Sequence, residues 1–175
     1  MASPKTFVSG KEQYFPDEDI IVSKTDLKGR ITYVNREFLK IAGYEEHEVM
    51  GQPHSMIRHP DMPRTVFKLL WETIQSNDDV YTYVINRCKN GDHYWVLAHV
   101  TPSHDSSGNV IAYHSNRWVP DRRILTEIVM PLYADLRREE QRHTDRKTGL
   151  SAASDYLQSL LRKKGSSYDE FVFSL

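Results

Sequence analysis

Arg58, His59 and Asp61 have the residue types and the spacing that suit a phosphate-binding site. They lie in the polar segment 51–63, which contains three prolines and leads directly into an apolar helical pattern. An arginine side chain can pair with two phosphate oxygens at once, and the first backbone N–H groups of a helix attract the same anion. Without a ligand, Asp61 would cap the helix and Arg58 would pair with a surface carboxylate. From the residues alone, both interpretations stay open.

A cofactor held at such a site would also need an apolar cleft for its ring, with a few amide or aromatic groups in the wall. Asn86 can offer its amide, and Trp71 can pack against a ring from the helix that follows the polar segment. Trp71 also has the spacing of an ordinary core residue. Asn35 has two interpretations as well, because it can cap a helix or contact the cleft.

The segments around these residues predict an antiparallel sheet of five strands with helices over one face, which is an α+β fold. Five runs are rich in β-branched and aromatic residues, and turns with Gly or Asn-Gly separate them. Asn35 and Gly43 are suited to begin and end a first helix, and Pro63 can begin the longest one. The expected strands are 20–25, 31–35, 80–88, 93–101 and 110–119, and the expected helices are 36–42, 45–50 and 62–75.

The C-terminal part of the chain is expected to be helical. An apolar stripe begins after Asp121, which can act as an N-cap, and Pro131 is expected to kink or break that helix. The charged segment 137–148 is expected to be an exposed connection, 151–164 a second helix, and 168–175 a tail that docks. Because the stripe has more apolar surface than a free helix should expose, we expect it to pack on the sheet, on a second copy or on a partner. The stripe consists of Ile124, Leu125, Ile128, Val129, Leu132 and Leu136.

Composition limits the classes of function. The chain has 175 residues, enough for one domain with an appendage, and its net charge of −1 gives no field that would recruit nucleic acid. Residues 1–7 lack the apolar core of a signal peptide, and no apolar run approaches the roughly 20 residues of a membrane span. We therefore expect a cytoplasmic protein that does not insert into a membrane. The single Cys88 excludes a thiolate metal cluster, and no P-loop, Gly-x-Ser-x-Gly or kinase segment suggests an enzyme.

In order and spacing, these segments resemble the PAS sensory domain, and most closely the redox- and oxygen-taxis receptors that hold FAD. The resemblance rests on residues 25–35, on the Arg-His-Pro-Asp-Met-Pro sequence within 51–63, and on residues 87–95. It divides the chain into an N-terminal extension at 1–14, a PAS sensory domain at 15–120 and a C-terminal helical extension at 121–175.

The resemblance implies a function. In the FAD-binding taxis receptors the Arg, His and Asp of this sequence are tied to FAD binding, which implies that role for Arg58, His59 and Asp61. The chain would then be a cytoplasmic redox or oxygen sensor for aerotaxis, or energy taxis. Its expected partner is a membrane chemoreceptor-like transducer on a separate chain, with homodimerisation through the C-terminal helices as a further expectation.

Several alternatives accompany this interpretation. FMN could replace FAD, a haem could be held with His54 or His59 on the iron, or the domain could be a cofactor-free dimerisation or scaffold module. The chain also departs from its relatives at Val80, where FAD-binding members commonly carry Trp. Light-sensing flavin domains have a reactive Cys where this chain has His54, so we expect no photoadduct at that site.

Overall fold

Five strands form one antiparallel sheet in the computed structural model, which describes residues 7–175. The order across the sheet is β2-β1-β5-β4-β3, so the first hairpin joins the later meander through the β1–β5 pair. The predicted α+β fold with five antiparallel strands is therefore confirmed, and β4 runs further than expected. The strands are β1 (Ile21–Thr25), β2 (Ile31–Val34), β3 (Val80–Arg87), β4 (His93–His104) and β5 (Val110–Trp118).

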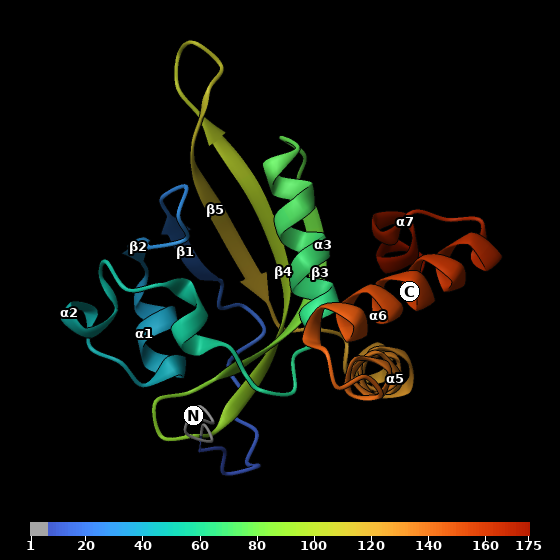
Figure 1. Ribbon diagram of the computed structural model, residues 1–175. Coiled ribbons are helices and arrows are strands. Elements are labelled where there is room, and N and C mark those ends of the chain that lie inside the picture. The colour runs from blue at the N-terminus through green and yellow to red at the C-terminus, as the bar shows by residue number, and fades with distance from the viewer. Residues whose placement is uncertain (1–6) are drawn as a thin grey trace.

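The chain between β2 and β3 forms the helices that lie over the inner face of the sheet (Figure 1). The longest of them, α3, runs beside β3 and β4 and gives the inner face its main apolar cover. Its residues Val66, Leu70 and Ile74 are buried, as the predicted amphipathic stripe requires. These elements are α1 (Arg36–Ala42), α2 (Glu46–Val49), the 3₁₀ turn η1 (His54–Ile57) and α3 (Arg64–Gln75).

Asn35 begins α1 and Gly43 ends it, as the sequence predicts. The Asn35 side-chain oxygen accepts hydrogen bonds from the backbone N–H groups of Phe38 and Val22, at 3.1 and 2.9 Å, and its amide nitrogen donates to the Ile20 carbonyl at 2.7 Å. Gly43 has a φ of 73°, the left-handed conformation that glycine adopts without strain. The Asn35 side chain therefore makes its three hydrogen bonds to backbone groups.

The start of α3 differs from the expectation. The helix begins at Arg64, and Asp61 does not cap it. Pro63 occupies the N-cap position and has no side-chain acceptor to offer. The acceptor comes from Glu140, whose carboxylate receives the Thr65 backbone N–H at 2.8 Å. Local sequence rules missed this cap because its two members are 75 residues apart.

The C-terminal chain is helical, as predicted, but Pro131 does not break it. A π-helical turn, η2, comes directly before Pro131, which occupies the first turn of the next helix. The wider turn accommodates a residue that has no N–H and whose ring displaces the carbonyl one turn earlier. The elements are α4 (Arg122–Ile124), η2 (Leu125–Val129), α5 (Met130–Gln141), α6 (Arg146–Lys164) and α7 (Tyr168–Phe173).

The prediction of an exposed connection at 137–148 is correct for residues 142–145 and wrong for the helical residues on either side. Helix α5 continues to Gln141, and α6 begins at Arg146 after the side chain of Asp145 caps it. The charged residues misled the prediction because most of them face solvent, whereas Glu140 on the same helix is buried. The tail 168–175 docks as expected, with Tyr168 and Phe171 buried.

The C-terminal helices cover the free edge of β3 (Figure 1). The Tyr133 hydroxyl donates to the Tyr83 carbonyl at 2.5 Å, and the Asp169 carboxylate accepts the Tyr81 backbone N–H at 3.3 Å. These bonds satisfy groups that an open edge strand would leave free for another chain. The apolar stripe also packs within the chain, since its residues Leu125, Val129 and Leu136 are buried.

None of the helices between residues 7 and 175 is long and apolar enough to cross a membrane. The prediction that the chain lacks a signal peptide rests on residues 1–7, of which 1–6 lie outside the described part of the chain.

Candidate cofactor site

A cleft with a volume of about 290 Å³ lies between α3, η1 and the inner face of β3, β4 and β5. This volume is near the lower end of the roughly 300–1,000 Å³ that small-molecule sites span. The Trp71 ring meets Tyr113 edge-on, with 5.7 Å between the centroids, and it also covers Gly29, where a Cβ atom would approach the ring at 3.1 Å. The apolar wall is completed by Leu70, Ile74, Val84, Ala98 and Val100.

The floor of the cleft is polar, and its polar atoms are buried without partners. Asn86 Nδ2, Ser115 Oγ and Arg117 Nη1 form no hydrogen bond with any residue between 7 and 175. The three residues are only 2%, 6% and 4% exposed. Buried polar groups in native proteins nearly always have partners, so these atoms indicate a ligand with a polar edge. The Asn86 side chain also lies beside Tyr94 on the neighbouring strand, whose hydroxyl is likewise unpaired among residues 7–175. Because these two residues could satisfy each other, Arg117 is the stronger indication of a ligand.

Arg117 is a buried cation that no acidic residue of the described chain pairs with. Its Nη2 donates to Ser23 Oγ and to His54 Nε2, both at 2.8 Å. Burial lowers the pKa of Arg117 to about 10, which still leaves it charged at neutral pH. Burial, and then the charge of Arg117, lower the pKa of His54 to about 3, so its ring is neutral. His54 is half-buried and lines the cleft.

The neutral tautomer of His54 follows from these bonds. Its Nε2 accepts from the guanidinium of Arg117, so the ring proton must reside on Nδ1. His54 therefore holds the guanidinium in place without neutralising its charge. A metal would compete with Arg117 for the same lone pair, so the geometry does not favour His54 as an iron ligand. Among residues 7–175, no three His, Cys, Asp or Glu side chains are grouped to hold a metal ion.

Arg58 lies at the mouth of the cleft. Its guanidinium stacks on the ring of Phe67, 4.0 Å from the centroid, and its backbone pairs with that of Asn86 in an isolated bridge. Burial lowers the pKa of Arg58, the charge of Glu140 raises it, and Arg64 lowers it further. Within the described chain the guanidinium has no ion pair and no hydrogen bond, so its donors are available to a ligand at the mouth.

Residues 31–117 match the model of the family described as the PAS fold. The chain contains a PAS domain. The predicted family resemblance is thereby confirmed.

The relatives of this PAS domain support the assignment. The aerotaxis receptor of Escherichia coli (strain K12) is 38% identical over 135 residues, which are 77% of this chain and 26% of the receptor. The nitrogen fixation regulatory protein of Klebsiella pneumoniae is 26% identical over 94 residues, or 54% of this chain and 19% of that protein. The chain thus spans about a quarter of the first relative and about a fifth of the second.

Solved structures show the same PAS fold. The light-state structure of the blue-light photoreceptor Aureochrome1 LOV has a TM-score of 0.56 at 25% identity and covers 62% of this chain and 88% of its own. A Light-Oxygen-Voltage domain studied with a flavin analogue has a TM-score of 0.57 at 20% identity and covers 70% of this chain and 88% of its own. The second likeness bears on the fold alone.

The PAS cleft brings together three of the six residues that the sequence suggested. Arg58, Trp71 and Asn86 line it, whereas Asn35 caps α1. His59 and Asp61 also lie outside the cleft wall.

His59 and Asp61 shape the polar segment and do not line the PAS cleft. The His59 ring is buried, its Nδ1 accepts the Asp61 backbone N–H at 3.1 Å, and its centroid is 5.4 Å from that of His93. Burial lowers the pKa of His59, which favours the neutral ring that this hydrogen bond needs. The Asp61 carboxylate pairs with Arg137 at 2.6 Å. These two residues would therefore affect a cofactor indirectly, by positioning Arg58.

Sequence reasoning missed Arg117 and gave His54 a different role. Arg117 shares the inner face of β5 with Tyr113 and Ser115, four and two residues earlier. A charged residue at an inward position of a strand is unusual, and that alternation was the available signal. Val80, where relatives commonly carry Trp, is 1% exposed and does not line the cleft.

Proposed function

We propose that this PAS domain binds a flavin in the cleft, with FAD as the expected form, and acts as a redox sensor. The observation that carries the proposal is Arg117, a buried guanidinium without an acidic partner at the floor of an apolar cleft of ring size. A flavin has a flat apolar ring system with an edge of carbonyl and N–H groups, so it matches both the wall and the floor. The resemblance of the Arg-His-Pro-Asp-Met-Pro sequence to FAD-binding taxis receptors, together with the 38% identity to the aerotaxis receptor, supports the same cofactor.

The residues present suit the chemistry of such a cofactor. A bound flavin would supply electron transfer, with negative charge gained on its ring upon reduction. Arg117 would stabilise negative charge at the floor, because no carboxylate of the described chain neutralises it and water is largely excluded. Asn86 would contribute an amide hydrogen bond, and Trp71 would pack against the ring. His54 would keep the guanidinium oriented in both redox states.

Strand β3 offers a route from the cleft to the C-terminal helices. Asn86 stands in the cleft, and the backbone of Tyr81 and Tyr83 on the same strand bonds to Asp169 and Tyr133. We infer that a change of charge in the cleft alters the docking of α5 and α7 through this strand. Hydrogen exchange of α4–α7 in the oxidised and reduced protein tests the inference, and equal exchange in the two states would contradict it.

We further propose that the signal passes to a membrane chemoreceptor-like transducer on another chain. The 38% identity to the aerotaxis receptor over 135 residues, which are 77% of this chain, is the support for this partner. Homodimerisation through the C-terminal helices is the second proposal for output. Because Leu125 and Leu136 are buried within the chain, a dimer would use Ile128 and Met130, which are 37% and 39% exposed.

The cleft is tested by comparing two asparagines of the sheet, Asn86 on β3 and Asn116 on β5. Asn86→Ala removes the inward amide, and Asn116→Ala is the control, because Asn116 faces the other side of the sheet and bonds to His114. We expect FAD to bind about tenfold more weakly to Asn86→Ala, which corresponds to one lost hydrogen bond, and unchanged to the control. Equal affinities in all three proteins would remove Asn86 from the site.

A further inference from the structure

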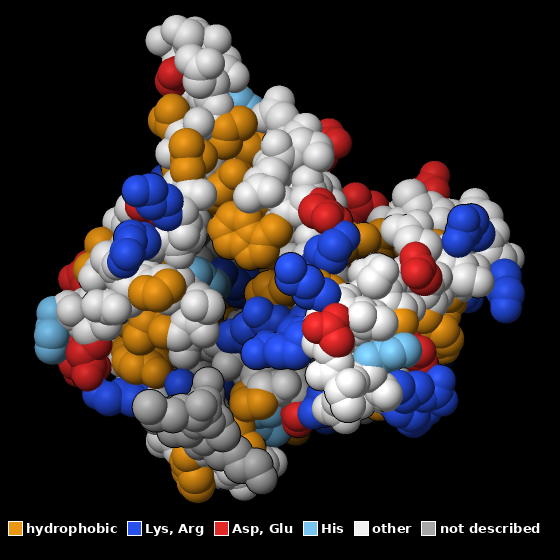
Figure 2. Space-filling view, viewed as in Figure 1, with side chains coloured by type: hydrophobic (Ala, Val, Ile, Leu, Met, Phe, Trp, Pro, Cys, Tyr) orange, Lys and Arg blue, Asp and Glu red, His pale blue; other side chains and the backbone are white. Residues whose placement is uncertain are grey.

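Arg58 lines the mouth of the cleft, and two further arginines lie near it, one of which belongs to the C-terminal extension. Arg58 precedes α3, Arg64 begins α3, and Arg146 begins α6. The charges of Arg64 and Arg146 both lower the pKa of Arg58, so both lie within electrostatic range of its guanidinium. Figure 2 shows Lys and Arg side chains gathered in the hollow near the centre of the molecule, next to hydrophobic side chains.

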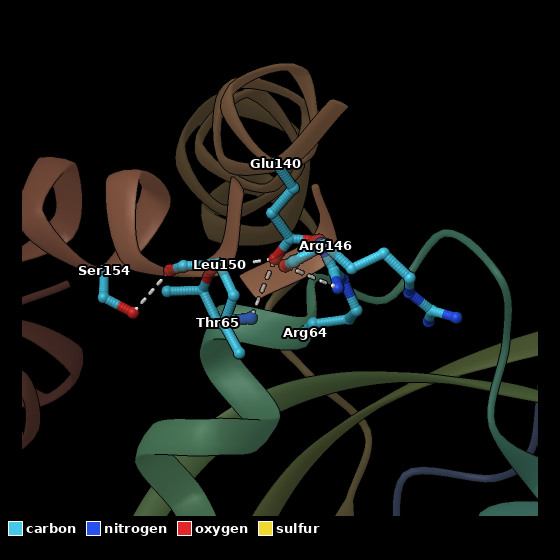
Figure 3. Close-up of polar contacts among 6 residues, drawn as sticks. All are labelled: Arg64, Thr65, Glu140, Arg146, Leu150 and Ser154. Carbon is cyan, nitrogen blue, oxygen red and sulfur yellow. Dashed lines mark hydrogen bonds and ion pairs between the residues drawn. The ribbon is translucent and has the colours of Figure 1, made fainter. Parts of the chain in front are cut away.

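One carboxylate, that of Glu140, stands among these cations. Its Oε1 accepts from the backbone N–H and the hydroxyl of Thr65, both at 2.8 Å, and its Oε2 accepts from Arg64 Nε at 3.2 Å (Figure 3). Glu140 therefore occupies the Thr65 N–H in the first turn of α3, near the place where the sequence predicted a phosphate. A phosphate at the mouth of the cleft would bind beside this N–H.

Arg146 is held close to this place and keeps its charged group free. Its backbone carbonyl accepts from Arg64 Nη1 at 3.1 Å, which joins the first residues of α6 and α3. In Figure 3 the Arg146 side chain extends away from Glu140 toward the loop that precedes α3. Within residues 7–175 its guanidinium has no ion pair, and the same is true of Arg58. Arg58 at the mouth and Arg146 near it therefore have guanidinium groups without an acidic partner among residues 7–175.

We propose that Arg146 on α6 completes a phosphate-binding site with Arg58 and Arg64, so that the C-terminal extension helps to select a phosphorylated flavin. The inference rests on the proposed function, in which a flavin ring would fill the cleft and its phosphate would be bound by residues near the mouth. Guanidinium groups suit this ligand, because each can donate two parallel hydrogen bonds to phosphate oxygens. Phosphate binding and docking of the extension then support each other, because Arg146 contributes to both.

Titration of the cofactor-free protein with riboflavin, FMN and FAD separates the ring from the phosphates. We expect Arg146→Ala to bind FAD about tenfold more weakly, as the loss of a charge-assisted hydrogen bond implies, and to bind riboflavin as the unaltered protein does. Arg162→Ala is the matched control, because Arg162 is exposed in the last turn of the same helix. Circular dichroism and thermal melting establish that both variants are folded.

Inorganic pyrophosphate distinguishes failure of this inference from failure of the flavin proposal. If the unaltered protein binds no flavin but binds pyrophosphate in a way that Arg146→Ala abolishes, the arginine site stands and the flavin proposal falls. If Arg146→Ala weakens riboflavin and FAD by the same factor, the arginine acts through the fold and the inference is overturned. Unchanged binding of both FAD and pyrophosphate in Arg146→Ala would overturn it as well.

Discussion

Replacing Arg117 by methionine should stabilise the cofactor-free protein while making a bound flavin harder to reduce. The guanidinium is buried with hydrogen bonds to Ser23 and His54 but without a carboxylate partner in the described chain. Methionine has a similar length and no charge, so it fills much of the same space. Ser23 and His54 would keep each other as partners, because Ser23 Oγ is already 3.2 Å from His54 Nε2. Arg117→Met therefore separates two effects of the charge, namely the stability that it costs the cofactor-free protein and the stabilisation that it gives to a reduced flavin.

The size of both effects follows from the structure. Burial lowers the pKa of Arg117 from 12.5 to about 10, which corresponds to about 3 kcal/mol against the charged form. The two hydrogen bonds have a charged donor and offset about 1.5 kcal/mol each, and the Ser23–His54 hydrogen bond that would replace them contributes about 1 kcal/mol in the variant. Arg117→Met should then raise the free energy of unfolding by about 1 kcal/mol. A charge that stabilises a negative ring by about 1.5–3 kcal/mol raises a two-electron midpoint potential by about 30–60 mV, which the variant should lose.

Urea unfolding of the cofactor-free proteins measures the first effect, and redox titration of the flavin-loaded proteins measures the second. Arg117→Lys is the control, because it keeps a positive charge and should keep most of the midpoint potential. If Arg117→Met is clearly less stable than the unaltered protein and its midpoint potential is unchanged, Arg117 is a structural residue and the reasoning about the buried charge is refuted.

Three further predictions concern neighbouring residues. Glu140→Ala leaves the Thr65 N–H and hydroxyl without their acceptor and should lower the free energy of unfolding by about 2 kcal/mol, whereas the exposed Glu127→Ala should change it by less than about 0.5 kcal/mol; equal urea midpoints would refute the cap. Because the pKa of His54 is lowered from 6.5 to about 3, the unfolded chain binds more protons between these values, and stability should fall as pH drops below about 6.5, by about 2 kcal/mol at pH 5. A His54→Asn variant should lose that part of the pH dependence, and an unaltered pH profile would contradict the assignment. Arg58→Ala should lose most of its flavin on purification while its circular dichroism is unchanged, and full flavin retention would remove Arg58 from the site.

Most of the fold could be predicted because its signals are local. Alternating β-branched residues mark the strands, the Asn90-Gly91 pair marks the turn before β4, and Asn35 and Gly43 mark the ends of α1. Pro131 shows the limit of such rules, since a π-helical turn before it absorbs the strain that was expected to break the helix.

The candidate site was predicted in part, and the missing parts depend on distant contacts. Arg58 and Asn86 could be predicted from residue type, because a guanidinium suits a phosphate and an amide suits the polar edge of a ring. Arg117 and His54 are 63 residues apart, and only the pairing of β5 with β1 beside η1 brings them together. Asp61 looked like a cap for α3, but Glu140 takes that position from another part of the chain.

The absorption spectrum of the protein purified without added cofactor tests the central claim most directly, followed by release and chromatographic identification of the chromophore. We expect a flavin spectrum and stoichiometric FAD. A haem spectrum, or a colourless protein that binds neither FAD nor FMN on incubation, would contradict it.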